Sequence, residues 1–243
     1  ERAGAKLMVH RPAADEVEVD GTLGDEDLDR VVARDALGEL AAGRSGVRHY
    51  GEHGEAREDS LRVFIEAFAA PPRMLLFGAV DFTLALVRVA KVLGYRVTVC
   101  DAREVFATRQ RFPLADEVVV DWPHRYLAAE VEAGRIDPRT VLAVLTHDPK
   151  FDVPLLEVAL RLDVAYVGAM GSRRTHDDRL DRLREVGLTE EEIGRLCSPI
   201  GLDLGARTPE ETAISIAAEI VAGRWGGSGE RLATTSGRIH GEE

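Results

Sequence analysis

The sequence predicts an α/β protein, with a parallel β-sheet covered by helices and a smaller α+β segment before it. From residue 73 onward, short apolar runs alternate with amphipathic stretches, which is typical of strands connected by helices. The apolar runs are continuous rather than alternating, and this indicates strands that are buried on both faces. Pro71 and Pro72 resist helix and favour an extended connection, so the two parts meet there.

Residues 1–70 form the smaller, N-terminal α+β domain. We expect this domain to be truncated at its start, because the chain begins at Glu1 rather than at methionine. Apolar side chains recur at helical spacing after Asp25, and Gly43 ends that stretch. The expected elements are strands over residues 6–10 and 17–20, a helix over 25–42, and strands over 47–50 and 61–68.

Residues 71–243 form the second domain, which ends in a helical segment and a tail. Thr189 and Thr208 each precede a glutamate by three residues, the capping-box pattern of a helix start. The expected strands cover residues 74–77, 96–100, 118–120, 141–145 and 164–167, and the main helices cover 81–93, 126–132, 153–162, 179–186 and 209–222.

The composition excludes several classes of function. A net charge of −12 and the absence of a basic run argue against nucleic acid as a partner. Because no apolar stretch approaches the roughly 18 residues of a membrane helix, we expect a soluble, cytoplasmic protein without a membrane partner. Cys100 and Cys197 are too few for a disulfide framework or a metal cluster, which fits a reducing compartment.

The turn between the first strand and first helix of the sheet is a candidate ligand loop. A Rossmann-type fold holds a pyrophosphate at this turn, here Gly78 and Ala79, and a ribose at an acidic residue about 20 positions later, here Asp101. Val80 replaces the second glycine of the usual pattern, and Asp81 adds negative charge. The pattern predicts the Rossmann-type sheet, and it leaves open whether the turn still binds a nucleotide.

Two further candidates follow the fourth and fifth strands. His147 and Asp148 come after the fourth strand, where a histidine can act as a base, a donor or a ligand. The alternative is a loop histidine and a helix-capping aspartate, and one pair is too small for a metal site. The loop after the fifth strand contains Gly171, Ser172, Arg173 and Arg174. Its backbone N–H groups, its hydroxyl and its two guanidinium groups suit a bound anion. The alternative is a helix start that carries surface arginines.

A glycine-punctuated loop precedes the last helix, with Gly201, Asp203 and Gly205 as candidate ligand-binding residues. The loop is either a second wall of the site or a structural turn. The sequence contains no G-x-S-x-G, Walker or H-E-x-x-H motif, so we assign no catalytic and no metal-binding residue.

Four segments carry a resemblance to a known family: residues 166–174 (YVGAMGSRR), 199–205 (PIGLDLG), 208–211 (TPEE) and 215–220 (SIAAEI). On these segments the chain resembles the XdhC/CoxI family, the accessory proteins of molybdenum hydroxylases such as xanthine dehydrogenase and carbon monoxide dehydrogenase. Residues 4–24 resemble part of the family's smaller N-terminal domain. The chain departs from the family's G-A-G-H at positions 78–81 and from its G-G-G turn at positions 24–27.

The resemblance implies a cofactor chaperone rather than an enzyme. Such a protein binds molybdenum cofactor, as molybdopterin or its cytosine dinucleotide, protects it during sulfuration and delivers it to the apo-enzyme. The implied partners are a molybdenum hydroxylase apo-enzyme and a cofactor sulfurase, and we expect a homodimer. One rival interpretation is an NAD(P)-dependent oxidoreductase, in which Asp101 binds the ribose and His147 acts as acid or base. Val80 argues against this interpretation, because it replaces the second glycine of the phosphate-binding turn. Another is a protein–protein adaptor with a decayed nucleotide site.

Overall fold

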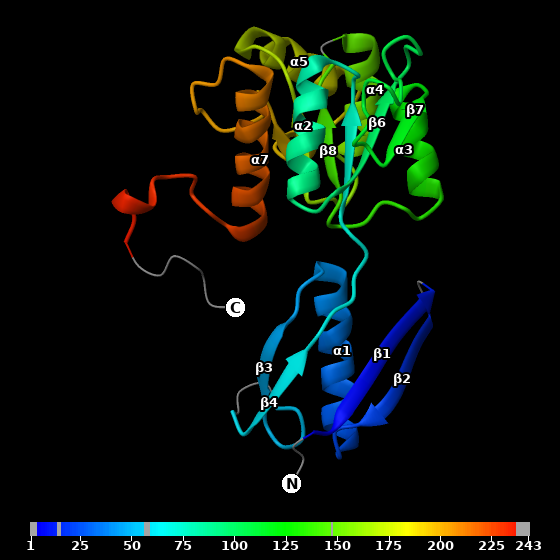
Figure 1. Cartoon of the computed structure of the whole chain (residues 1–243), viewed down its shortest axis with the longest axis vertical. Helices are drawn as coiled ribbons and strands as arrows, with labels where there is room; N and C mark the ends of the chain where they lie inside the picture. Colours follow the sequence, from blue (N-terminus) through cyan, green and yellow to red (C-terminus); the bar gives the residue numbers. More distant parts are fainter. Residues whose placement is uncertain (1–3, 14–15, 56–58, 147, 237–243) are drawn as a thin grey trace. The chain divides into compact units, whose positions relative to one another are not determined.

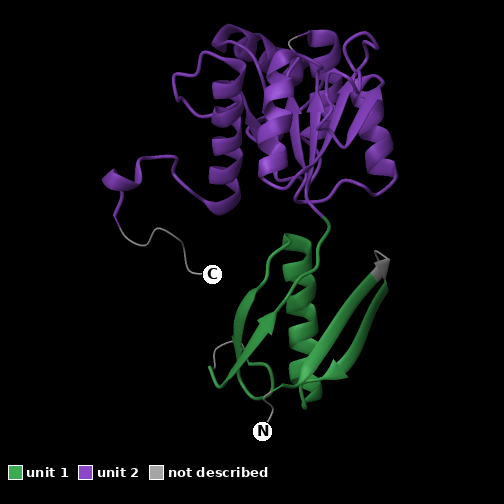
Figure 2. Cartoon of the chain, viewed as in Figure 1, with its two compact units in different colours: residues 1–70, 241–243 green, residues 71–240 purple. Residues whose placement is uncertain are grey.

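The computed structural model describes residues 4–13, 16–55, 59–146 and 148–236. The chain divides into two compact units, residues 1–70 with 241–243 and residues 71–240, which are coloured separately in Figure 2. We refer to them as unit 1 and unit 2. Among the described residues, no helix has the length and apolar character needed to cross a membrane.

The described part of unit 1 consists of two antiparallel strand pairs and one helix. Its elements are β1 (Lys6–Ala13), β2 (Glu16–Thr22), α1 (Glu26–Ala42), β3 (Gly46–Tyr50) and β4 (Leu61–Ile65). The Asp25 carboxylate accepts a hydrogen bond from the Leu28 N–H and starts α1, and Gly43 ends it in the left-handed conformation. The strand predicted over residues 61–68 ends at Ile65, because Ile65 pairs with Gly46, the first residue of its partner strand.

Unit 2 contains a sheet of six parallel strands in the order β10-β9-β8-β5-β6-β7. This is the strand order of a Rossmann fold, so the fold class predicted from the sequence is confirmed. The strands are β5 (Arg73–Phe77), β6 (Arg96–Asp101), β7 (Glu117–Val120), β8 (Val141–Val144), β9 (Tyr166–Ala169) and β10 (Leu196–Cys197).

Helices cover both faces of this sheet (Figure 1). One buried cluster joins α2 and α7 to the sheet, and a second joins α3, α4 and α5 to its other face. Both clusters contain alternate residues of the same strands, which explains why these strands read as continuous apolar runs. The helices are α2 (Asp81–Val92), α3 (Pro123–Glu132), α4 (Pro149–Ala159), α5 (Arg173–Glu185), α6 (Glu190–Ile193) and α7 (Pro209–Trp225), and the 3-10 turn η1 is Leu232–Thr234.

Three helices begin earlier than the sequence pattern predicted. Helix α3 begins at Pro123, whereas the prediction began at residue 126. Helix α4 begins at Pro149, with Asp148 as its cap, whereas the apolar spacing placed its start at residue 153. Helix α5 begins at Arg173, with Ser172 as its cap, whereas the prediction began at residue 179. The first turns of α5 are polar, and the first turn of α4 has a single apolar side chain, Phe151, so hydrophobic periodicity does not detect either start. The two-residue strand β10 was not predicted, because two residues are too few to form a pattern.

Candidate functional site

The candidate residues of unit 2 follow the carboxyl ends of parallel strands, where open α/β sheets place their ligands. The sheet changes its direction of growth between β5 and β8. At this switch point the Leu145 N–H donates to the Phe77 oxygen at 2.8 Å, and the loops beyond both strands run close together. Gly78 has φ +108°, and a Cβ there would lie 2.9 Å from the Thr146 nitrogen. Packing between the two loops therefore requires glycine at position 78.

Asp101 is buried at the end of β6 and fastens the turn after β5. Its carboxylate accepts hydrogen bonds from the Ala79 N–H at 2.7 Å and from the Arg103 N–H at 2.9 Å. The Arg103 guanidinium adds two more, at 2.9 and 2.7 Å. Burial alone would raise the pKa of Asp101, but these donors lower it below its ordinary value of 3.8. The four bonds account for Asp101 without a bound ribose.

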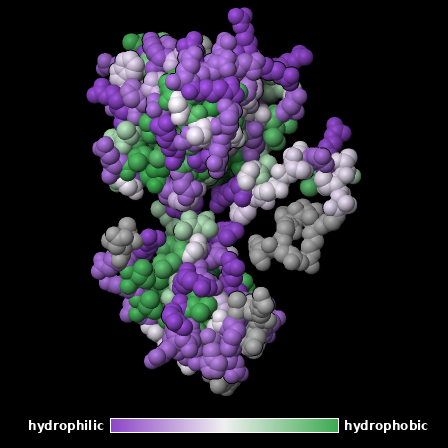
Figure 3. All heavy atoms as spheres, turned by 180° about the vertical axis from the view of Figure 1, so that it is seen from behind, coloured by the Kyte–Doolittle hydropathy of each residue, from purple (hydrophilic) through white to green (hydrophobic). Residues whose placement is uncertain are grey.

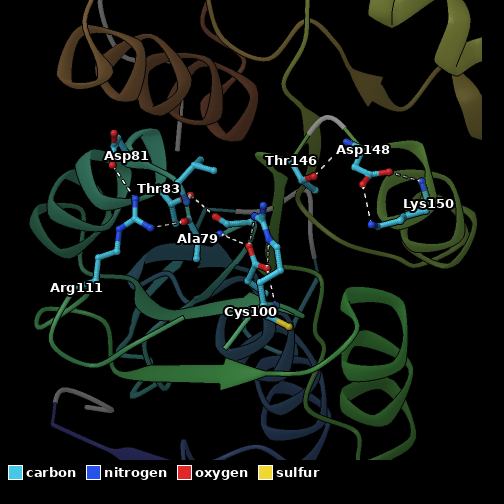
Figure 4. A network of polar contacts seen from close by, with 12 residues as sticks. Ala79, Asp81, Thr83, Cys100, Arg111, Thr146, Asp148 and Lys150 are labelled. Carbon is cyan, nitrogen blue, oxygen red and sulfur yellow. Dashed lines mark hydrogen bonds and ion pairs between the residues drawn. The ribbon is translucent and has the colours of Figure 1, made fainter. Parts of the chain in front are cut away.

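The N-terminus of α2 is held by contacts within the chain (Figure 4). The Thr83 hydroxyl donates to the Gly78 oxygen and lies 3.4 Å from the Val80 nitrogen. Arg111 donates to the Ala79 oxygen at 2.9 Å and to the Asp81 carboxylate at 2.7 Å. A carboxylate of the protein thus stands at the helix end where a Rossmann fold places the ligand's phosphate.

Thr146 and Asp148 lie across the switch point from Ala79 (Figure 4). Asp148 is the N-cap of α4, since its carboxylate accepts from the Lys150 N–H at 3.1 Å, and it also forms an ion pair with the Lys150 ammonium. Desolvation of Asp148 acts to raise its pKa, whereas the hydrogen bonds and the positive charge of Lys150 lower it. The lysine has the larger effect, so the pKa of Asp148 is lowered. The capping role that the sequence offered as an alternative is therefore present. His147 lies outside the described residues.

The loop after β9 leads into the exposed N-terminus of α5. The Ser172 hydroxyl caps the helix by accepting from the Thr175 N–H at 3.2 Å. A Cβ at Gly171 would lie 3.0 Å from the Thr175 Cβ, so the loop passes close to the first helical turn. Arg173 and Arg174 are exposed in this turn. Two guanidinium groups beside the positive end of a 13-residue helix form an arrangement that attracts anions.

The loop after β10 packs against α7. Gly201 has φ +100°, and a Cβ there would lie 2.5 Å from the Ser215 hydroxyl oxygen. Its N–H donates to the Glu219 carboxylate at 2.9 Å, and the Leu202 N–H donates to the Ser215 oxygen at 3.2 Å. These contacts give Gly201 a structural role. Asp203 and Gly205 are exposed farther along the same loop.

Residues 74–220 match the family model of the XdhC Rossmann domain. The chain belongs to the XdhC family. This match covers the candidate residues from Gly78 to Gly205, and it confirms the resemblance on which the sequence interpretation rested.

Curated relatives of this XdhC-family chain include YqeB of Escherichia coli K12, an uncharacterised protein that is 30% identical over 227 residues. A probable xanthine dehydrogenase component of Bacillus subtilis 168 is 28% identical over 69% of the chain. The molybdenum cofactor insertion chaperone PaoD of E. coli K12 is 36% identical over 38% of the chain. The chain spans 40%, 47% and 29% of these relatives, less than half of each.

A crystal structure of a xanthine dehydrogenase from Bacillus halodurans is similar to the chain with a TM-score of 0.56 and 24% identity. The similarity covers 90% of this chain and 69% of that one. At this level of identity, the similarity concerns the fold.

Arg179 of the XdhC-family domain was not selected from the sequence, yet it holds the loop that carries the two exposed arginines. Its side chain is 3% exposed and donates to the Asp152 carboxylate at 3.0 Å. It also donates to the Met170 oxygen at 2.7 Å and to the Ser198 hydroxyl at 3.0 Å. One guanidinium therefore ties together α4, the loop after β9 and the loop after β10. A usable signal was its spacing of four residues from Leu183, which places both on the buried face of α5.

Exposed aromatic side chains at this edge of the sheet were also missed. Trp122, which follows β7 and is 41% exposed, packs on Phe151 of α4 with ring centroids 5.2 Å apart. The Lys150 ammonium lies 4.7 Å from the Phe151 ring centre. On the loop after β6, the Arg103 guanidinium lies 4.6 Å from the ring centre of Phe106, which is 40% exposed. Flat rings beside cations provide surfaces on which a planar anionic ligand can stack.

Proposed function

We propose that this chain binds molybdenum cofactor at the carboxyl edge of its Rossmann sheet and delivers it to a molybdenum hydroxylase. The observation that carries the proposal is the glycine loop after β9, which presents Arg173 and Arg174 in an exposed helix start within the XdhC domain. The name of PaoD, a molybdenum cofactor insertion chaperone, supports the same cargo. The chain then acts as a carrier and not as a catalyst.

The chemistry of the cargo fits the residues at this edge. Molybdopterin carries a phosphate, and its cytosine dinucleotide form carries a pyrophosphate. Guanidinium groups bind such oxygens through paired, charge-assisted hydrogen bonds, and the N–H groups of the first turn of α5 add further donors. With a net charge of −12, the protein repels an anion elsewhere on its surface, so the anion is directed to this cationic loop.

The planar pterin needs a different kind of contact from the phosphate. Trp122 offers an exposed ring at the same carboxyl edge of the sheet, and the buried ring of Phe151 supports it from below. We assign the pterin to the Trp122 ring and the phosphate to the loop after β9. Gly78, Ala79 and Asp101 shape the switch point in this arrangement, and the α2 N-terminus takes no phosphate, because Asp81 occupies it.

The proposed partners follow from the proposed delivery. The cofactor passes to a molybdenum hydroxylase apo-enzyme in the cytoplasm, and a sulfurase acts on it while the chaperone, as a homodimer, holds it. The names of relatives point to xanthine dehydrogenase as one enzyme of this class. A transfer assay tests delivery separately from binding: loaded protein is mixed with apo-enzyme, and the recovered hydroxylase activity is measured against free cofactor.

Titration of the protein with isolated cofactor tests the binding site. We expect Arg173→Ala or Arg174→Ala to weaken binding by about 1.5–3 kcal/mol, the range for a hydrogen bond to a charged group, which is more than tenfold. Replacement of the contacting arginine by lysine restores part of the affinity, because an ammonium group cannot bind two oxygens as a fork.

The matched control is Arg88→Ala, which removes an exposed arginine from α2. The control variant is expected to bind normally, and all variants keep the melting temperature of the original protein, because exposed arginines support no core. Normal binding by both loop variants would show that the loop is structural. Unfolding of both would lead to the same conclusion.

A further inference from the structure

Helix α7 carries small or apolar side chains around most of its circumference. From Thr212 to Gly223 its only charged residue is Glu219, whose carboxylate accepts hydrogen bonds from the Tyr166 hydroxyl and the Gly201 N–H. A surface helix normally has a single apolar stripe, and a helix that is apolar on all sides is normally covered on all sides. Helix α7 therefore needs more cover than the sheet alone provides.

Two of the three faces of α7 are covered within the chain. The residues that face the sheet and α2 are buried, namely Ala213, Ile216 and Ile220. On a second face, the loop after β10 packs on Ser215 and Glu219, which are bonded to its backbone. The third face receives no such cover.

This third face is an exposed apolar stripe. Ile214, Val221 and Trp225 are between 40% and 60% exposed, and Ala218 is half-buried between them. At about 3.6 residues per turn, the four positions fall on one side of the helix. Figure 1 and, from behind, Figure 3 show the described chain after Trp225 running away from α7, so this segment leaves the stripe open.

The spacing of the stripe suits a second copy of the same helix. Its four positions follow one another at intervals of four, three and four residues, so the pattern reads the same in both directions. When two copies of α7 pack antiparallel about a two-fold axis, Ile214 faces Trp225 of the other copy, and Ala218 faces its Val221. Intervals of three and four residues also keep apolar side chains along one seam between two packed helices.

The charges of α7 favour the same arrangement. Its first turn contains Glu210 and Glu211, and its last turn contains Arg224. An antiparallel pair brings the acidic start of each helix toward the basic end of the other, and it also aligns the two helix dipoles favourably. A parallel pair would place like charges side by side. The sequence of the helix is therefore complementary to its own reverse.

The exposed surface around the stripe is large enough for a dimer. Helix α2 lies beside α7, and its end adds Val92 and Leu93, which are both exposed. Two adjacent helices of these lengths present a face of roughly 25 Å by 20 Å. Because side chains roughen such a face, its accessible area reaches the roughly 800 Å² per partner of a standard interface.

We propose that two copies of the chain form a dimer through antiparallel packing of their α7 helices. The carboxyl edge of each sheet lies at the start of α7, because β10 leads through its loop into that helix. Antiparallel packing therefore places the two carboxyl edges at opposite ends of the dimer. Each copy then binds and delivers its own cofactor, a step that rests on the proposed carrier function, and neither copy contributes a residue to the site of the other.

Sedimentation velocity of the whole chain and of charge variants tests the interface. We expect the unmodified protein to be a dimer at micromolar concentration. Val221→Glu buries two carboxylates in the apolar seam and should raise the dissociation constant of the dimer at least about a hundredfold. The matched control is Val131→Glu, which changes a valine of similar exposure on α3, on the other face of the sheet, and should leave the dimer intact.

A mixing experiment tests the register and does not depend on a loss alone. Ala218→Lys is also expected to be a monomer, because it places two ammonium groups in the seam. An equal mixture of Ala218→Lys and Val221→Glu should form a mixed dimer, since the lysine of one copy then faces the glutamate of the other. This recovery would show that both variants are folded.

A monomeric unmodified chain would overturn the proposal. Dimers of Val221→Glu as strong as those of the original protein would do the same, because another surface then joins the copies. Two monomeric variants that do not combine when mixed would contradict the antiparallel register.

Titration with isolated cofactor separates the interface from the carrier function. Monomeric Val221→Glu should bind one cofactor per chain with the original affinity. Loss of binding in this variant, restored in the mixed dimer, would show a shared site and refute the two independent sites. A protein that dimerises as expected but binds no cofactor would refute the carrier function and still support the interface.

Discussion

Replacing Arg179 tests how the candidate anion loop is held in place. Arg179 and Asp152 are each 3% exposed, and the guanidinium is also bonded to the Met170 oxygen and the Ser198 hydroxyl. Arg179→Met keeps much of the side-chain volume but leaves the Asp152 carboxylate without this cation. Removal of one partner of a buried ion pair typically costs about 3–5 kcal/mol, because the remaining charge stays desolvated.

The magnitude for Arg179→Met lies within that range. The bonds to Met170 and Ser198 are made by the same group, so their loss is included rather than added. For a unit of this size, 1 kcal/mol changes the melting temperature by about 2–4 °C, so a decrease of roughly 6–20 °C is expected. We also expect weaker cofactor binding, because the carbonyl that Arg179 holds directly precedes Gly171.

Urea denaturation of four proteins measures this effect: the original, Arg179→Met, Asp152→Asn and the double variant. The double variant should lose less stability than the two single variants together, since each single change already breaks the pair. Arg182→Met, at an exposed position of the same helix, is the control and should be nearly neutral. A loss below about 1 kcal/mol for Arg179→Met, or strict additivity, would refute the role given to this ion pair.

Two further predictions concern Asp101 and the loop after β10. The pKa of Asp101 is lowered in the folded state, so its charge stabilises unit 2 above the unfolded-state value of about 3.8 and loses this effect as pH falls through the folded-state pKa. Asp101→Asn should therefore reduce stability at pH 7, and its difference from the original protein should shrink as the pH falls below 3.8, as thermal melts would reveal. Gly201→Ala should cost about 2–5 kcal/mol in denaturation experiments, from a positive φ and a Cβ 2.5 Å from Ser215 Oγ. Gly205 also has a positive φ, but an added Cβ would point into open space, so Gly205→Ala should cost only about 1–2 kcal/mol. Equal losses of stability for the two variants would contradict the packing argument.

The sequence was sufficient to predict the Rossmann sheet because its signals are local. Continuous apolar runs mark strands that are covered on both faces, and capping residues mark helix starts. The capping boxes predicted at Thr189 and Thr208 are present with Glu192 and Glu211. The starts of α4 and α5 were placed too late, because their first turns carry too few apolar side chains to form a pattern and only their caps, Asp148 and Ser172, reveal them.

The candidate site was less predictable because its contacts join distant parts of the chain. Asp101 was interpreted by its position after β6, but its partners are the Ala79 N–H and a neighbouring arginine, which compete with a ligand for its oxygens. Arg179 looks like one more charge on a highly charged helix until Asp152 is found opposite it. Pairings between separate elements depend on register and packing, which the residue pattern of one segment does not contain.

The N-termini of α2 and α5 lie at the same edge of the sheet and differ in charge, which leads to a last prediction. At α2, Val80 replaces the second glycine of the usual pattern, and the Asp81 carboxylate is held by Arg111 at 2.7 Å; at α5, two arginines are exposed. Val80→Gly alone should therefore leave NAD binding weaker than about 1 mM, or −4.1 kcal/mol, because Asp81 still repels the phosphate. Val80→Gly with Asp81→Ala removes both obstacles and frees Arg111, so NAD affinity should rise by more than tenfold while cofactor affinity stays unchanged. Calorimetry with both ligands measures this. NAD binding tighter than 1 mM by the unmodified chain would instead identify α2 as the anion site and favour the oxidoreductase interpretation.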